Sequence, residues 1–262
     1  MLIPIKKLLK QVYYAFHQTY FRLKGGKIEC NVCSFKADRL SSDTWHPYSI
    51  CPRCGSSIRQ RLLMQVLIEH PEFNRIRILS GKRILHFAPE KILRDKIRVN
   101  ASDYRTADFF AEGYYYPDID FNLDISSMPS IATESYDVLI ACDVLEHVPD
   151  DRKALLEVYR VLSKGGYCIF TVPQKDQLIV TFEDKTVTDP MERERVFGQR
   201  DHLRIYGDDF ADLIQQAGFA LSIIDASFFS EEVIEKNVLF PPILSSNPLA
   251  TNHRKIFIGR KG

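Results

Sequence analysis

The sequence lacks three features that would assign it to particular classes of protein. Its 35 basic and 34 acidic side chains leave a formal charge of only +1, which gives no global reason to expect a nucleic-acid ligand. No apolar run approaches the roughly 18–20 residues that a membrane span needs. The N-terminal stretch MLIPIKKLLKQVYYAF has lysines within its apolar part and no small-residue cleavage site, so we do not expect a signal peptide.

The composition is otherwise that of a globular protein, with 45% apolar and 26% charged residues. A length of 262 residues suggests one large domain, or one domain with a small module. Residues 1–26 are predicted to form a basic amphipathic helix. This helix either docks on the rest of the chain or contacts an anionic membrane surface or a partner, and the sequence does not decide between these. It does not give the oligomeric state either.

Four of the six cysteines form two C-x-x-C pairs that are separated by the 17 residues 34–50. Pairs with this spacing are typical of a tetrahedral zinc site with four thiolate ligands, and they favour a reducing, cytoplasmic location over disulfides. Because four thiolates close the coordination sphere, the zinc should be structural rather than catalytic. We therefore predict a zinc ribbon over residues 27–57, with the ligands Cys30, Cys33, Cys51 and Cys54.

Residues 136–173 predict a strand, a helix and a second strand. The apolar run 138–142 suits a buried parallel strand, and 167–172 suits another. Between them, apolar residues recur at helical spacing from Asp150 to Lys164, and Gly165-Gly166 supply a left-handed stop. Such a unit builds a parallel sheet with helices on both faces, and its ligands bind at the carboxyl ends of the strands.

Further elements are expected on both sides of this unit. Helices are predicted over 57–70 and 208–220, with a short one at Glu231–Asn237. The other predicted strands are 84–87, 104–108, 121–125, 220–226 and 256–258, and the last two are expected to close the sheet as an antiparallel pair.

The motif D-V-L-E-H-V, followed by a helix that ends in R-V-L-S-K-G-G, resembles class I S-adenosylmethionine (SAM)-dependent methyltransferases of the type 11/12-like kind. The C-x-x-C pairs, H-F-A-P-E and F-G-Q-R-D-H are similar to a narrower group that carries a four-cysteine zinc ribbon. The resemblance implies a methyltransferase domain over 58–262. Its fold would be a Rossmann-like α/β sandwich with a seven-stranded, mainly parallel sheet, and its cofactor SAM.

The same resemblance implies the cofactor site. Most class I methyltransferases carry D-x-G-x-G-x-G after the first strand, where this chain has Phe87, Ala88, Pro89 and Glu90 within H-F-A-P-E. The helix that follows still offers free N–H groups, and Glu90 could accept from the cofactor ammonium group.

The remaining cofactor contacts are implied at later strand ends. Asp108 would accept from the ribose hydroxyls, and Asp124 from the adenine amino group with Ile125 against the ring. Asp143 and Val144 would face the cofactor from the fourth strand.

The acceptor site is expected in the insert 174–207, which we interpret as a lid. His202 is the predicted general base, oriented by Asp201 or Glu183. The alternative is that Arg200, Asp201 and Arg204 only clamp the insert. For Glu146 and His147 the favoured interpretation is that they fix their turn by hydrogen bonding.

The predicted activity is methyl transfer to a small-molecule or glycan acceptor, with a sugar hydroxyl preferred. Balanced charge argues against nucleic acid, yet RNA methylation stays open because four arginines could form a local basic patch. The missing glycines also keep open a non-catalytic scaffold on a degenerate fold. The four arginines are Arg59, Arg61, Arg200 and Arg204, and the first two are expected to be solvated or to line the cleft.

Overall fold

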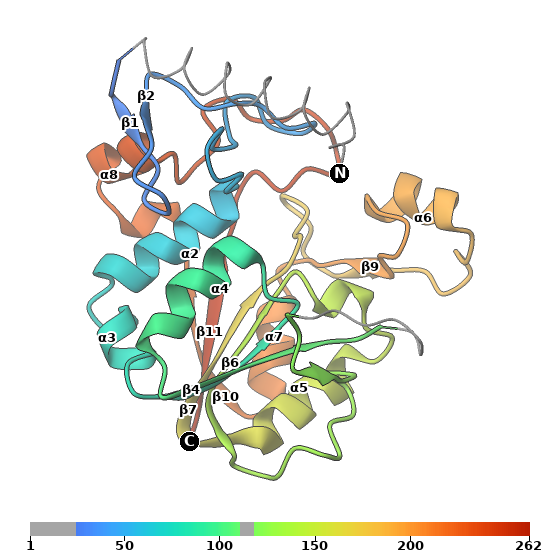
Figure 1. Cartoon of the computed structure of the whole chain (residues 1–262). Coiled ribbons are helices and arrows are strands. Elements are labelled where there is room, and N and C mark those ends of the chain that lie inside the picture. The colour runs from blue at the N-terminus through green and yellow to red at the C-terminus, as the bar shows by residue number, and fades with distance from the viewer. Residues whose placement is uncertain (1–24, 111–117) are drawn as a thin grey trace, which may run out of the picture.

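The computed structural model describes residues 25–110 and 118–262, so the helix predicted within 1–26 lies almost entirely outside the described residues. At its centre is a seven-stranded sheet with the order β10-β11-β7-β6-β3-β4-β5 (Figure 1). Strands β3 to β7 are parallel, and β11 runs antiparallel between β7 and β10. This confirms the predicted mainly parallel sheet with an antiparallel end. The strands are β3 (Arg83–Phe87), β4 (Asp103–Asp108), β5 (Phe121–Asn122), β6 (Tyr136–Cys142), β7 (Leu162–Thr171), β10 (Phe219–Ile224) and β11 (Ile256–Lys261).

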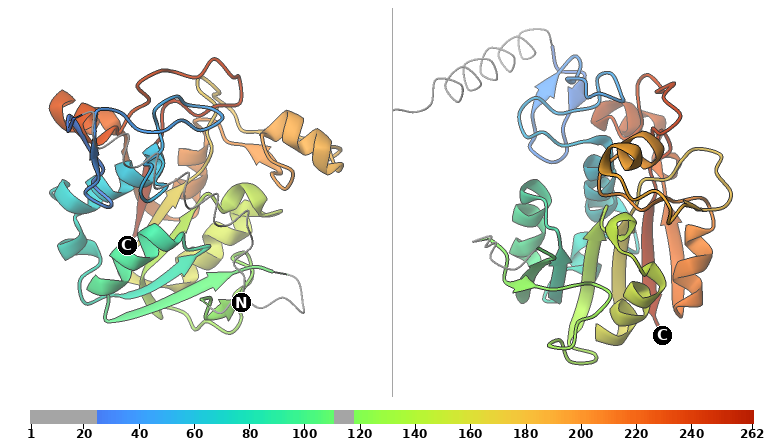
Figure 2. Two further views of the ribbon diagram at one scale, coloured as in Figure 1. Left: turned by 45° about the horizontal axis from the view of Figure 1, so that its top comes forward. Right: turned by 90° about the vertical axis from the view of Figure 1, so that its right-hand side faces the viewer.

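Helices cover both faces of this sheet (Figure 2). Successive side chains of β6 point to opposite faces, which gives the chain two apolar cores. Val138 and Ile140 pack with side chains of the helices on one face, and Leu139 and Ala141 with those on the other. The first face carries α2 (Ile58–Glu69) and α4 (Lys91–Ile97), and the second α5 (Asp151–Val161) and α7 (Phe210–Gln216).

The predicted ribbon contains a two-stranded sheet of β1 (Ile28–Glu29) and β2 (Lys36–Ala37). Figure 1 places it at the end of the molecule above α2, beside α8 (Glu231–Asn237). The short α3 (Arg75–Ile78) follows α2. Three turns are 3-10 helices: η1 (Arg98–Asn100), η2 (Leu145–His147) and η3 (Ala226–Phe228).

The insert 174–207 contains a short strand pair, β8 (Phe182–Glu183) with β9 (Arg204–Ile205), and the helix α6 (Pro190–Phe197). In Figure 1 α6 stands away from the sheet. Local residues set the boundaries of α6. The Asp189 side chain caps its first turn, Pro190 is its first residue, and Gly198 ends it at φ 92°.

The end of α5 differs from the prediction. The helix stops at Val161 rather than Lys164, and β7 begins at Leu162. Leu162 already pairs with Tyr136 of β6, and the register then shifts before Val138. Gly165, at φ 74°, and Gly166 therefore form an irregularity within the strand instead of ending the helix.

Among the described helices, none combines the length and apolar character needed to cross a bilayer.

Gly166 gives a test of this strand packing. A Cβ placed there would lie 2.8 Å from the Ser163 carbonyl oxygen and 2.9 Å from that of Asp137, which are both backbone atoms. We expect Gly166→Ala to lower the free energy of unfolding by about 1–3 kcal/mol, measured by denaturant titration.

Gly26→Ala is the matched control, because its new Cβ would meet nothing within 4 Å. Equal stability of the two variants would contradict the close approach of β6 and β7.

Candidate active site and metal centre

The predicted cofactor residues all lie where parallel strands end. The turn from Ala88 to Glu90 follows β3, Asp108 is the last residue of β4, and Asp143 follows β6. Asp124 comes two residues after β5, which is shorter than predicted, and forms an isolated bridge with Ser127. Because carboxyl ends of parallel strands share one edge of a sheet, the structure brings these residues to the same edge.

The turn after β3 has the backbone that glycine normally provides. Ala88 has φ 43°, in the left-handed region, and its N–H donates to the Ala107 carbonyl at 2.8 Å. An alanine pays about 1–2 kcal/mol for this conformation, whereas glycine adopts it freely. The departure from the glycine-rich motif thus changes the side chain at this position but keeps the shape of the turn.

Local hydrogen bonds hold the two acids predicted to bind the ribose and the adenine. Oδ1 of Asp108 accepts from the Phe109 N–H, and Oδ1 of Asp124 accepts from both the N–H and the hydroxyl of Ser126. Among the described residues these bonds engage one oxygen of each carboxylate. Burial raises the pKa of Asp108 above its ordinary value. Each acid is therefore fixed in orientation with a second oxygen available.

Arg59 of α2 reaches this edge, so the expectation that it is solvated was wrong. Its Nη2 lies 2.6 Å from Glu90 Oε1 and its Nε 2.9 Å from Asp143 Oδ2, and its side chain is only 10% exposed. Burial opposes its charge, but Asp143 and Glu90 outweigh that effect and raise the pKa of the guanidinium. The same pairing keeps the pKa of Asp143 below its ordinary value, against the burial that would raise it.

Two atoms of this bridge are buried without a hydrogen-bond partner among the described residues. They are Nη1 of Arg59 and Oε2 of Glu90. A buried unpaired donor and acceptor are costly, so they indicate a ligand that supplies both partners. A zwitterionic amino-acid group, with its carboxylate and its ammonium, has this chemistry.

The second half of the insert is tied to the D-V-L-E-H-V turn. Nη1 of Arg204 donates to the carbonyls of Leu145 and Val148, at 3.0 and 2.6 Å. The Leu203 N–H donates to the Glu146 carbonyl at 2.9 Å. Arg204 is 2% exposed, so this clamp is buried rather than a surface charge network.

The clamp places His202 at the edge of the sheet, but not with the expected partners. Its Nδ1 lies 3.0 Å from the Phe197 carbonyl oxygen, so Nδ1 carries the proton and Nε2 the lone pair. Asp201 instead contacts Nδ1 of His147 at 3.3 Å, and Glu183 pairs with Arg204. A backbone carbonyl therefore orients His202, and neither predicted carboxylate does.

Glu146 also departs from expectation, because its side chain does not fix the turn. It is 1% exposed, and neither carboxylate oxygen has a hydrogen-bond partner among the described residues. Burial, reinforced by the charge of Asp143, raises the pKa of Glu146 well above its ordinary value. His202 Nε2 lies 3.9 Å from its Oε1, and burial lowers the pKa of that imidazole.

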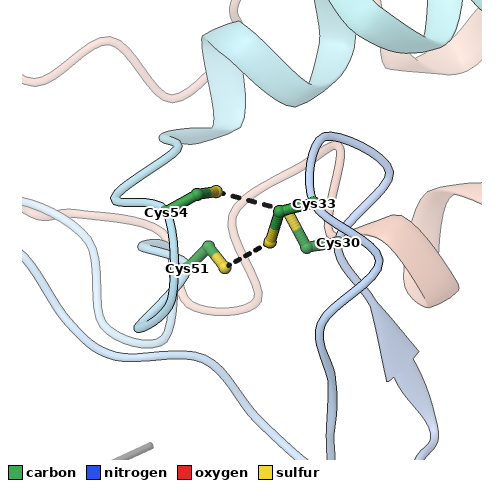
Figure 3. A group of neighbouring side chains, drawn as sticks. All are labelled: Cys30, Cys33, Cys51 and Cys54. Carbon is green, nitrogen blue, oxygen red and sulfur yellow. Dashed lines mark hydrogen bonds between the residues drawn. The ribbon is translucent and has the colours of Figure 1, made fainter. Parts of the chain in front are cut away.

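The four predicted cysteine ligands converge at the ribbon (Figure 3). Sγ of Cys30 lies 3.8 Å from that of Cys54, and Sγ of Cys33 lies 3.6 Å from that of Cys51. Four thiolates at Zn–S distances of about 2.3 Å in a tetrahedron would lie about 3.8 Å apart. The separations thus fit a zinc ion and are too long for disulfides.

The two cysteine loops share one backbone design. The carbonyl of Cys30 accepts from the Ser34 N–H and that of Cys51 from the Gly55 N–H, at 2.7 and 2.8 Å. Ser34 and Gly55 both have a positive φ, of 58° and 76°. Each loop therefore turns back over its own first cysteine and points two sulfurs to the same side.

Arg61 supports the cluster from beneath, and the expectation that it is solvated or lines a cleft was wrong. It is fully buried and donates to the carbonyls of Ser49 and Ser56, within the predicted ribbon, and of Val238, after α8. Burial lowers the pKa of its guanidinium to about 10, so it stays charged at neutral pH beside the cysteines.

A cavity of about 970 Å³ lies next to the ribbon and α8, and not at the strand ends. Its walls include Lys27, Asp38 and Glu235. Arg254 also lines it, and Nη1 of this residue is buried without a partner among the described residues. Burial lowers the pKa of the Arg254 guanidinium, although the charges of Asp143 and Glu146 oppose this effect.

Comparison with known proteins agrees with this architecture. Residues 88–170 match the methyltransferase domain family, a span that begins at Ala88 and ends within β7. A segment of 72 residues is 36% identical to arsenite methyltransferase of Rattus norvegicus, and it covers 26% of this chain and 19% of that protein.

Two solved structures resemble this chain at low sequence identity. The [4+2]-cyclase SpnF matches with a TM-score of 0.50 and 16% identity, over 85% of this chain and 86% of its own. A SAM-dependent methyltransferase from Mesorhizobium loti matches with a TM-score of 0.49 and 14% identity, over 71% of this chain and 94% of its own. Residues 88–170 thus match a methyltransferase domain, and the chain has the class I SAM-dependent methyltransferase fold.

Proposed function

We propose that this chain transfers a methyl group from SAM to a hydroxyl group of a small molecule or glycan, with a sugar hydroxyl as the preferred acceptor. The observation that carries the cofactor assignment is the unpaired pair of buried atoms beside the first turn, Arg59 Nη1 and Glu90 Oε2. They match the carboxylate and the ammonium of the methionine half of SAM. When bound, SAM supplies an electrophilic methyl group on a sulfonium centre.

The chain's own residues would bind and orient this cofactor. The second oxygens of Asp108 and Asp124 would accept from the ribose hydroxyls and from the adenine amino group. Ile125, which is 2% exposed, would pack against the adenine ring, and Val144 would line the same edge. Catalysis in this arrangement is mainly positioning, because the acceptor oxygen must approach the methyl group in line with the breaking bond.

On the acceptor side, His202 is the residue that we expect to act on the hydroxyl. Nε2 of His202 holds a lone pair and could take the proton of the acceptor hydroxyl as the oxygen–carbon bond forms. The insert 174–207 would cover this side as a lid, with Arg204 as its buried anchor. Asp201 would act on His147 rather than on His202.

The hypothesis that RNA is the acceptor rested on a basic patch formed by four arginines. Arg59, Arg61 and Arg204 are buried, and Arg200 pairs with Glu194 at 2.7 Å. The four arginines therefore do not form an exposed basic patch of the kind that a phosphate backbone requires. The scaffold hypothesis rested on the missing glycines, and Ala88 keeps the backbone shape that glycine would have.

We also propose that the four cysteines hold one structural zinc ion, with Cys30, Cys33, Cys51 and Cys54 as ligands. The sulfur separations and the charged Arg61 beneath the cluster support this. Thiolate ligands suit a reducing compartment, and so do the free, buried thiols of Cys142 and Cys168. We therefore also propose a cytoplasmic location.

Cofactor binding can be tested by calorimetry with SAM and S-adenosylhomocysteine. We expect micromolar binding to the wild type. Asp124→Asn should weaken it at least about tenfold, because the amide keeps an oxygen for Ser126 but turns a donor toward the adenine amino group.

Asp212→Ala, at an exposed position on α7, is the control and should bind as the wild type does. Absence of binding in a folded, zinc-loaded wild type would overturn the proposed function and favour the scaffold.

Metal analysis tests the zinc site. Cys51→Ser should remove one equivalent of zinc from the purified protein and lower its melting temperature, because metal binding contributes folding energy to so small a module. Cys168→Ser is the matched control: this cysteine is buried in the sheet and donates to the Gly259 carbonyl, which a hydroxyl can also do. Equal zinc contents in the two variants would rule the site out.

A further inference from the structure

A second group of ligand-type side chains lies at the edge of the sheet, away from the cysteines. One ligand atom from each of Glu146, His147 and His202 lies within 4.8 Å of the other two. Glu146 and His147 are neighbours on η2, and His202 comes from the insert. The clamp between Leu203 and Glu146 holds these two segments together.

The side chains of Glu146 and His202 are buried, and their ligand-type atoms have no hydrogen-bond partner among the described residues. Both oxygens of Glu146 and Nε2 of His202 make no hydrogen bond among the described residues. Their side chains are 1% and 4% exposed. Native structures rarely leave three such atoms unpaired at one place, so they indicate a missing partner.

Direct pairing between the two side chains does not satisfy them. Glu146 Oε1 and His202 Nε2 are 3.9 Å apart, beyond hydrogen-bond distance. Two ligands at about 2.1 Å from a common divalent ion lie about 3.0–3.4 Å apart. Closing the gap by about half an ångström, which a small side-chain rotation supplies, would bring both into coordination.

The outer contacts of both imidazoles match those of metal-binding histidines. Such histidines usually donate their second ring N–H to a carboxylate or a backbone carbonyl. Nδ1 of His202 donates to the Phe197 carbonyl at 3.0 Å, and Nδ1 of His147 faces Asp201 at 3.3 Å. The Phe197 contact occupies Nδ1 of His202 and leaves its Nε2 lone pair for a ligand, while Asp201 contacts the ring of His147.

We propose that Glu146, His147 and His202 form a binding site for one divalent transition-metal ion, distinct from the zinc of the ribbon. Two imidazoles and one carboxylate suit Mn²⁺, Fe²⁺ or Zn²⁺ and leave further coordination positions open. Asp201 is a positioning residue for His147 and not a ligand. Two negative charges face the ion, because Glu146 is a carboxylate ligand and Asp201 lies beside His147.

The site also bears on the acceptor, and this step rests on the proposed function. An open coordination position at the strand ends would take the acceptor hydroxyl and lower its pKa, so that its proton leaves to solvent. His202 would then be a ligand and not the base, because one lone pair cannot serve both purposes. The metal titration decides between these two roles.

The test is a titration with Mn²⁺ of the full chain carrying one equivalent of zinc, followed by electron paramagnetic resonance of the free ion. Mn²⁺ prefers oxygen and nitrogen ligands and does not displace zinc from four thiolates. We expect saturable binding of one Mn²⁺ per chain, without SAM or acceptor. Failure of this titration leaves cofactor binding untouched, so the two proposals fail separately.

Variants locate the ion. His202→Gln and Glu146→Gln should weaken Mn²⁺ binding at least about tenfold, and Asp201→Asn by about 10–100-fold through His147. Asp201 is 69% exposed, so its variant keeps the fold. His70→Gln is the control, because this imidazole is buried against Phe73 and Phe228 elsewhere. No saturable binding to the folded wild type, or equal binding by all variants, would overturn the proposal.

Discussion

The ion pairs of Arg59 join the two parts of the molecule at the point where the candidate cofactor site lies. Arg59 is the second residue of α2, directly after the cysteine ribbon, and it contacts Glu90 after β3 and Asp143 after β6. Two carboxylates at neighbouring strand ends would repel one another without a buried cation between them. The same guanidinium leaves one nitrogen for a ligand. The charge of the candidate cofactor edge therefore depends on a single side chain, which lies on the helix that follows the ribbon.

The proposed acceptor side depends on a second buried arginine. Arg204 holds the insert on the carbonyls of the turn after β6, which brings His202 to Glu146 and His147. The insert is therefore not a detached flap: its last residues, 202–207, are mostly buried, while α6 extends outward. This division suits a lid with a rigid base that carries chemistry and an outer part that meets the acceptor.

The sequence was sufficient for elements with strong local signals. Buried apolar runs, the two C-x-x-C pairs and acids at strand ends predicted the sheet, the cysteine cluster and the edge where Asp108, Asp124 and Asp143 lie. It did not predict contacts made by tertiary docking. Nothing local indicates that Arg59 turns inward, or that His202 meets Glu146, which is 56 residues away (202 − 146). The end of α5 was misplaced because strand pairing at Leu162 overrides the glycine stop.

The central claim is that the altered first turn still holds SAM, with Arg59 and Glu90 replacing what the glycine-rich motif provides elsewhere. A crystal structure with S-adenosylhomocysteine tests it most directly. The account predicts the amino-acid end of the ligand against Arg59 Nη1 and Glu90 Oε2, the ribose at Asp108 and the adenine at Asp124. A ligand bound elsewhere, for example in the cavity beside α8, with Arg59 and Glu90 still unpaired, would contradict it.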